Sequence, residues 1–88
     1  MRPVRYVGSF RKDYKRILRR RYQIERLEII VGMLRRDKPL PANTRPHALQ
    51  GKWKGYSECH VGPNWLLIYK IRDEELILAG TGTHADLF

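Results

Sequence analysis

The spacing of apolar residues changes near the middle of the chain, and this change constrains the fold more than any other feature. Up to residue 34, apolar side chains recur every three or four positions, as along one face of a helix. From residue 53 they alternate with polar ones, and residues 65–71 are almost all apolar. Alternation is typical of a strand with one covered face. An unbroken apolar run is typical of a strand that is covered on both faces. The sequence therefore predicts an α+β fold in which helices precede most of a sheet.

Two amphipathic helices are expected in the first half of the chain. The first follows an N-cap at Ser9 and runs from Phe10 to about Arg21. The second begins near Ile24 and stops before the prolines at 39 and 41. Because only a residue or two separates them, they are expected to pack as an antiparallel helical hairpin.

Strands are expected on both sides of this hairpin. A short extended segment, 3–7, precedes the helices. After a proline-rich loop at 39–50, strands follow at 53–61, at 65–71 and from Leu76 onward. The order β-α-α-β-β-β predicts a small antiparallel sheet packed by the N-terminal helical hairpin.

Charge is distributed unevenly along the chain. The whole chain of 88 residues carries +9, and it is expected to form one domain, residues 1–88. Residues 1–46 hold fourteen basic and four acidic side chains, whereas residues 47–88 hold four basic and five acidic ones. A strongly basic half attracts polyanions, so a nucleic acid or an acidic protein is the expected partner. A basic surface that serves only solubility is the alternative.

The composition also bears on the compartment. No apolar run reaches the ~18–20 residues that span a bilayer, and the first residues lack the apolar core of a signal peptide. The lone cysteine, Cys59, has no partner for a disulfide and is expected to be a small buried hydrophobe. We therefore expect a protein of the cytoplasm, with no membrane partner.

Three histidines are the candidate chemical groups. His47, His60 and His84 all fall at the ends of expected segments, where a sheet could bring them together. Their spacings match no metal-ligand motif, and the chain has no glycine-rich phosphate loop, so neither a metal nor another cofactor is expected. Two or three imidazoles suit acid-base cleavage of RNA by its own 2′-hydroxyl, while ordinary surface histidines are the alternative.

Other residues could support such chemistry. Glu58 lies two residues before His60 and so on the same strand face, where it could orient that imidazole. Lys52 and Lys54 could contact phosphates. Trp65 could either stack on a base or belong to the core.

Three stretches carry a resemblance to a known family. HALQGKWKGY (residues 47–56), CHVGPNWLLIYK (59–70) and TGTHADLF (81–88) resemble the YafQ branch of the RelE/ParE toxin superfamily. The first 46 residues match that branch only in element order and charge. The resemblance implies a bacterial type II toxin that cleaves mRNA in the ribosomal A site. It also implies a cognate antitoxin of the DinJ or RelB kind that silences the toxin in a hetero-oligomer.

The resemblance also implies roles for single residues. His47, His60 and His84 fall on the family's catalytic histidines, Glu58 on an acidic position, and Phe88 on an aromatic that contacts mRNA. Two positions depart from the family pattern. Asn64 replaces an aspartate and cannot ionise. Gly80 replaces an arginine whose loss could slow cleavage by orders of magnitude, unless Arg45, Lys52 or Lys54 substitutes for it.

These residues give a hypothesis for the mechanism. His60 with Glu58 is the expected base, His84 the acid, and His47 a contact to the phosphate, although the base and acid roles could be exchanged. One alternative is a toxin homologue that has lost catalysis and survives as a module binding nucleic acid or antitoxin. The other is the ParE-like branch, which poisons DNA gyrase and offers no reason for three histidines.

Overall fold

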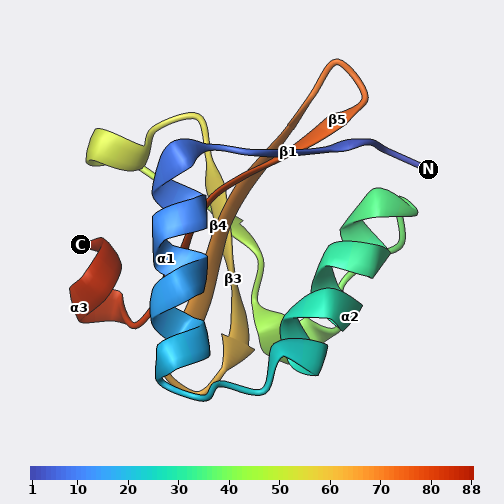
Figure 1. Ribbon diagram of the computed structural model, residues 1–88. Helices are drawn as coiled ribbons and strands as arrows, with labels where there is room; N and C mark the ends of the chain where they lie inside the picture. The colour runs from blue at the N-terminus through green and yellow to red at the C-terminus, as the bar shows by residue number, and fades with distance from the viewer.

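The chain folds into a mixed five-stranded sheet with helices on both faces, and the computed structural model describes residues 1–88. The strands lie in the order β1-β5-β4-β3-β2, and Figure 1 labels all of them except the two-residue β2. The elements are β1 (Val4–Tyr6), α1 (Gly8–Arg19), α2 (Ile24–Arg35), η1 (Ala42–Thr44), β2 (His47–Ala48), η2 (Gly51–Trp53), β3 (Ser57–Gly62), β4 (Trp65–Arg72), β5 (Glu75–Gly82) and α3 (His84–Leu87).

Strand β4 is the middle of the sheet, which confirms the interpretation of the apolar run. Residues 65–69 are all buried, and both neighbours, β3 and β5, pair with β4 in antiparallel register. The predicted antiparallel sheet is nevertheless incomplete, because β1 joins the edge of β5 in parallel, with Val4 opposite Leu76. The two-residue strand β2 also falls inside the predicted loop. An α+β fold is therefore confirmed, but its sheet is mixed.

The two long helices cover one face of the sheet. They run antiparallel as predicted, and α2 begins at Ile24, but α1 begins at Gly8 and ends at Arg19. The N-cap of α1 is Val7, not Ser9. The Ser9 hydroxyl instead donates a hydrogen bond to the carbonyl of Ala79 in β5 (2.6 Å). Helix α1 is thereby tied to the sheet at its first turn.

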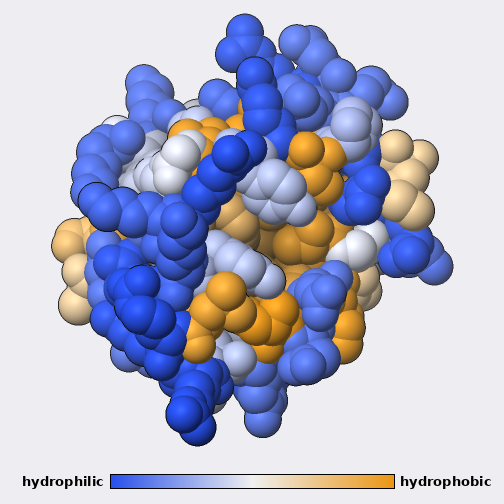
Figure 2. Space-filling model, viewed as in Figure 1, coloured by the Kyte–Doolittle hydropathy of each residue, from blue (hydrophilic) through white to orange (hydrophobic).

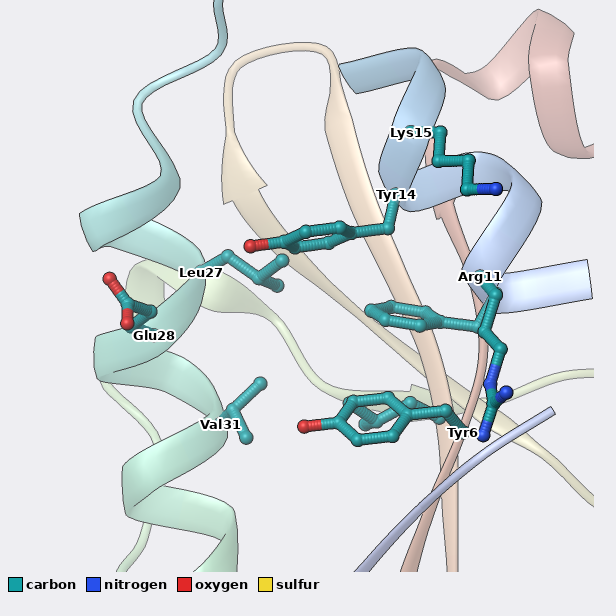
Figure 3. Close-up of a pocket in the computed structure, with 9 residues that line it drawn as sticks. Tyr6, Arg11, Tyr14, Lys15, Leu27, Glu28 and Val31 are labelled. Carbon is teal, nitrogen blue, oxygen red and sulfur yellow. The ribbon is translucent and has the colours of Figure 1, made fainter. Parts of the chain in front are cut away.

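A groove separates α1 from α2, so the predicted hairpin is splayed. Its volume is about 590 Å³, and six of the nine residues that line it are hydrophobic. Tyr6, Tyr14, Leu27 and Val31 point into it, whereas Arg11 and Lys15 stand on its α1 side (Figure 3). Figure 2 shows orange apolar patches between the blue hydrophilic residues of this face.

Each face of the sheet has its own apolar cluster. The larger cluster joins both helices to the inner positions of the strands, including Ile17, Leu27 and Cys59. The smaller one lies on the opposite face, where Leu66 and Ile68 meet Leu87 of α3. Cys59 is fully buried, as predicted, and burial raises the pKa of its thiol to about 12. None of the helices combines the length and the apolar character needed to cross a membrane.

Candidate active site

The first histidine forms a pair with a buried carboxylate across two strands. His47 of β2 stands opposite Glu58 of β3, and its Nε2 lies 3.0 Å from Glu58 Oε2. Its Nδ1 lies 2.8 Å from the carbonyl oxygen of Arg45. Both ring nitrogens therefore face acceptors. Glu58 is 7% exposed, and its Oε1 is buried without a partner.

This pair corrects the expectation that Glu58 orients His60. The two residues share a strand face, as predicted, but the nearer neighbour of Glu58 lies across the ladder rather than along the strand. The Glu58 carboxylate fixes His47 instead. One of its oxygens contacts the imidazole, and the other is buried without a partner.

His60 has a different partner, a guanidinium. Arg45 Nη2 lies 3.4 Å from His60 Nε2, and the imidazole is partly exposed. A guanidinium carries only donors, so this contact requires Nε2 to accept, with the ring proton on Nδ1. In this contact Nε2 is the acceptor, and an accepting imidazole nitrogen is the kind of group that can take a proton from a substrate.

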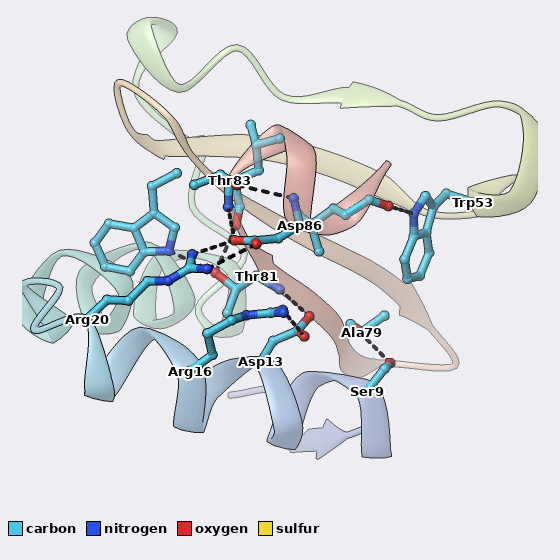
Figure 4. Close-up of polar contacts among 12 residues, drawn as sticks. Ser9, Asp13, Arg16, Arg20, Trp53, Ala79, Thr81, Thr83 and Asp86 are labelled. Atoms are coloured by element: carbon cyan, nitrogen blue, oxygen red, sulfur yellow. Dashed lines mark hydrogen bonds and ion pairs between the residues drawn. The ribbon is translucent and has the colours of Figure 1, made fainter.

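His84 is the first residue of α3, and that short helix is held by polar contacts (Figure 4). Thr83 and Asp86 form a capping box: the Thr83 side chain accepts from the Asp86 amide (3.1 Å), and Asp86 accepts from the Thr83 amide (2.9 Å). Arg20 at the end of α1 contacts both oxygens of Asp86, at 2.7 and 3.2 Å. These bonds from Arg20 and the Thr83 amide hold the pKa of Asp86 well below its usual range.

Two further contacts place the end of the chain. The indole nitrogen of Trp53 donates to the carbonyl of Leu87 (3.1 Å), and the Trp53 ring packs against the smaller apolar cluster. The rings of His84 and Phe88 stack with centroids 4.6 Å apart. Phe88 is 48% exposed, so one aromatic ring projects from the surface beside the third histidine.

One face of α1 supports the same region, and sequence reasoning missed it. Asp13 accepts from the amide of Thr81 in β5 (3.2 Å) and pairs with Arg16. Burial raises the pKa of the Asp13 carboxyl. Together with Ser9 and Arg20, these side chains recur at helical spacing on α1 and reach β5 and α3 (Figure 4). The recurrence of polar residues every three or four positions was the available signal.

The strand register brings the three histidines toward one region. His60 stands opposite Leu66 of β4, which stands opposite Gly82 of β5. Two strand spacings put His60 and Gly82 roughly 10 Å apart. His84 follows Gly82 by two residues, and α3 packs on the face of the sheet that carries Glu58 and His60. No direct contact joins the three imidazoles.

The remaining predicted residues separate into surface and core. Lys52 and Lys54 are exposed near this face, and the Lys52 ammonium lies 5.7 Å from the centroid of the Trp53 ring. Asn64 is exposed in the turn between β3 and β4. Trp65 is only 6% exposed. No face of the Trp65 ring is free for a base.

The contacts of Trp65 explain its burial. Its indole nitrogen donates to Thr81 Oγ1 (2.8 Å), and its ring lies edge-on to Tyr22 with centroids 4.9 Å apart. Of the two alternatives for Trp65, stacking on a base or packing in the core, the structure shows the core.

At Gly80, a side chain would fit only if neighbouring side chains shifted. A Cβ atom there would lie 3.1 Å from Leu87 and 3.2 Å from Asp13. No cation reaches the site from this position of β5. No group of three or more histidine, cysteine or acidic side chains is placed to hold a metal ion.

The fold and the site together define a class of protein. The sheet carries two helices on one face and histidines toward the other, and the chain is strongly basic. These are the features of a small RelE-like toxin. A model of the family described as "Bacterial toxin of type II toxin-antitoxin system, YafQ" matches residues 2–88. The chain belongs to this YafQ family.

Characterised relatives are similar over nearly the whole chain. The mRNA interferase toxin YafQ of Escherichia coli K12 is 43% identical over 88 residues, which cover 99% of this chain and 96% of the relative. A copper-bound mutant toxin from Helicobacter pylori has a TM-score of 0.93 at 38% identity, with 100% of both chains covered. The toxin in the E. coli DinJ-YafQ complex has a TM-score of 0.89 at 43% identity, covering 100% of this chain and 99% of that one.

Proposed function

We propose that this protein is the toxin of a type II pair and a ribosome-dependent endoribonuclease. It cleaves mRNA in the ribosomal A site and so inhibits translation in the bacterial cytoplasm. The observation that carries the proposal is the position of His60, beside the Arg45 guanidinium and in the same cross-strand region as an exposed His84. The similarity to the E. coli mRNA interferase supports the same reaction class.

The proposed reaction is acid-base transphosphorylation without a metal. His60 takes the proton of a 2′-hydroxyl, and the 2′-oxygen then forms a bond to the adjacent phosphorus. The bond from phosphorus to the 5′-oxygen breaks, and His84 gives that leaving oxygen a proton. The products are a 2′,3′-cyclic phosphate and a 5′-hydroxyl. His47, held between Glu58 and the carbonyl of Arg45, acts on the charge that develops on the phosphate electrostatically, through its ring.

The surrounding residues would hold the RNA strand. Phe88, already stacked on His84, offers an exposed ring to an unpaired base. Lys52 and Lys54 supply positive charge for phosphates, and the Asn64 amide can donate and accept hydrogen bonds. Trp65 contributes indirectly, because its bond to Thr81 fixes β4 against β5 beneath the site.

The proposed inhibitor is a cognate antitoxin of the DinJ or RelB kind, bound in a hetero-oligomer. The E. coli relative has been crystallised with DinJ, which supports a partner of this type. The basic helices would attract an acidic segment, and the groove between α1 and α2 offers apolar surface between the charges (Figure 2).

A second candidate function rests on the two departures from the family pattern. Gly80 supplies no cation and Asn64 no carboxylate, which favours a homologue that binds ribosomes or antitoxin without cutting. The two functions differ in one observable. Only an active toxin yields mRNA fragments, and those fragments must carry 5′-hydroxyl ends.

Mapping of mRNA 5′ ends in a translating extract tests the proposal. We expect codon-phased cuts with the wild-type protein and none with His84→Ala, whereas Ala85→Gly, next to it on α3, serves as a control that keeps cutting. Uncut mRNA with the wild-type protein, despite its binding to ribosomes, would establish the binding module instead. Cuts that carry 5′-phosphates would refute the acid-base chemistry.

A further inference from the structure

A second hollow lies beside His60 and is lined by basic side chains. Its volume is about 280 Å³, and its lining includes Arg26 from the first turn of α2, Asn43 and Arg45 from the segment around η1, and His60 from β3. We call it the Arg26/Arg45 pocket. One of its seven lining residues is hydrophobic, so it differs in character from the groove between the helices.

Neither guanidinium of this pocket has a carboxylate partner. No acidic side chain lines the pocket, and no ion pair within 4.0 Å involves Arg26 or Arg45. The one side-chain contact of Arg45 is His60 Nε2. Arg26 Nη1 lies near the turn, 3.5 Å from where a Cβ of Gly62 would stand. Two unpaired guanidiniums and an amide around one polar hollow make a site for an anion.

The backbone of Arg45 is held in an unfavourable conformation. Its φ of 46° and ψ of 59° are left-handed, which costs an L-residue about 1–2 kcal/mol. The next residue is Pro46, which further disfavours this region for the residue before it. This conformation lets one residue serve two histidines, because the Arg45 carbonyl accepts from His47 while its side chain reaches His60. Strain of this kind is concentrated at functional sites.

We propose that the Arg26/Arg45 pocket binds a phosphate of the RNA backbone next to the nucleotide at His60. Arg45 then acts as a catalytic residue that stabilises the charge on the phosphate, the role for which position 80 has no side chain. Binding of the phosphate draws the guanidinium away from His60 Nε2 and frees that nitrogen to take the 2′-hydroxyl proton. The catalytic part of this inference rests on the proposed function, whereas the binding part does not.

A salt titration of RNA binding tests the pocket. The probe is a single-stranded 2′-O-methyl oligonucleotide, which lacks the attacking hydroxyl, and fluorescence anisotropy gives its affinity at several salt concentrations. Loss of one phosphate contact lowers the slope of log K against log salt by about 0.7. We expect that decrease, with several-fold weaker binding, for Arg45→Gln and for Arg26→Gln.

Arg36→Gln is the matched control. Arg36 follows the other end of α2, is exposed and has no carboxylate partner, so it undergoes the same charge change outside the pocket. If Arg45→Gln and Arg26→Gln have the same slope and affinity as Arg36→Gln, the proposal is overturned. Circular dichroism melts establish that each variant is folded at the assay temperature.

Single-turnover cleavage on ribosomes separates this inference from the proposed function. Loss of an electrostatic contact to the transition state typically lowers the rate 10²- to 10³-fold, and we expect this for Arg45→Gln, with partial rescue by Arg45→Lys. If the wild-type protein cuts mRNA and Arg45→Gln cuts it at the same rate, the catalytic role of Arg45 is refuted and the proposed function stands. If the wild-type protein does not cut, the catalytic role fails with the proposed function, and the salt slopes alone decide whether the pocket binds phosphate.

Discussion

The pair of His47 and Glu58 predicts an energetic coupling that a double-mutant cycle can measure. Glu58 is nearly buried, and its one polar partner is the His47 ring at 3.0 Å. A hydrogen bond to a charged group contributes about 1.5–3 kcal/mol, and the 50% exposure of the His47 side chain favours the lower part of that range. We therefore expect His47→Ala to destabilise the fold by about 2 kcal/mol.

The cycle combines His47→Ala with Glu58→Gln. A neutral amide costs less to leave without its partner than a carboxylate, so we expect His47→Ala to cost about 1 kcal/mol less in the Glu58→Gln background. For a domain of this size, 2 kcal/mol corresponds to a decrease in Tm of roughly 10 °C. Urea unfolding followed by the fluorescence of Trp53 and Trp65 gives the free energies. A coupling below about 0.5 kcal/mol would show that Glu58 does not depend on His47.

This cycle also decides how a loss of activity should be interpreted. His47→Ala removes a candidate catalytic group and the partner of a buried carboxylate at the same time. Cleavage must therefore be compared at a temperature where both His47→Ala and the double variant are folded. A rate that is low in folded His47→Ala, while folded Glu58→Gln keeps cutting, would assign His47 to the chemistry.

Three further predictions concern the contacts around this site. Asp86→Asn should destabilise the fold at pH 7, because the Asp86 carboxylate is stabilised by Arg20. The pKa of Asp86 is lower in the folded than in the unfolded chain. The stability that wild type gains over Asp86→Asn is therefore present above the unfolded pKa of about 3.9 and is lost as the pH falls below it. Equal Tm values for Asp86→Asn and wild type at pH 7 would contradict this. Thr81→Val should cost about 1–3 kcal/mol in urea unfolding, since the buried Trp65 N–H loses its acceptor; an unchanged midpoint would assign Trp65 another partner. Cys59, with its pKa raised to about 12, should react with a maleimide at pH 8 only as fast as the fold opens, and rapid labelling of the folded protein would refute its burial.

The sequence predicted those parts of the fold that have a long periodic signal. The run at 65–71 is the central strand, and Ile24 begins the second helix. The parallel pairing of β1 with β5 could not be predicted, because alternation shows that a segment is a strand but not which strand it joins. Helix α3 has four residues, too few for a helical period. Its signal was the spacing of Thr83 and Asp86 in a capping box.

The contacts of the candidate site residues could be predicted only in part from the sequence. The three histidines lie on β2, on β3 and at the start of α3, and their joint role stays a prediction. The prediction that Glu58 orients His60 was wrong, because the partner of Glu58 depends on the register between β2 and β3. A two-residue strand in a loop gives no pattern from which that register can be derived. The position of Trp65 was undecided because an unbroken apolar run does not indicate which side chains face which layer.

The bonds from α1 to β5 have a consequence for how this sheet meets other chains. A bare strand edge is a template on which a second molecule can add a strand and begin to aggregate. Strand β1 pairs with only three residues of β5, and beyond them the outer edge of β5 would be such a template. There the Ser9 hydroxyl donates to the carbonyl of Ala79, and the Asp13 carboxylate accepts from the amide of Thr81. Replacing both side chains by alanine would expose this edge. Two polar residues of a helix therefore occupy backbone groups through which a further strand would pair.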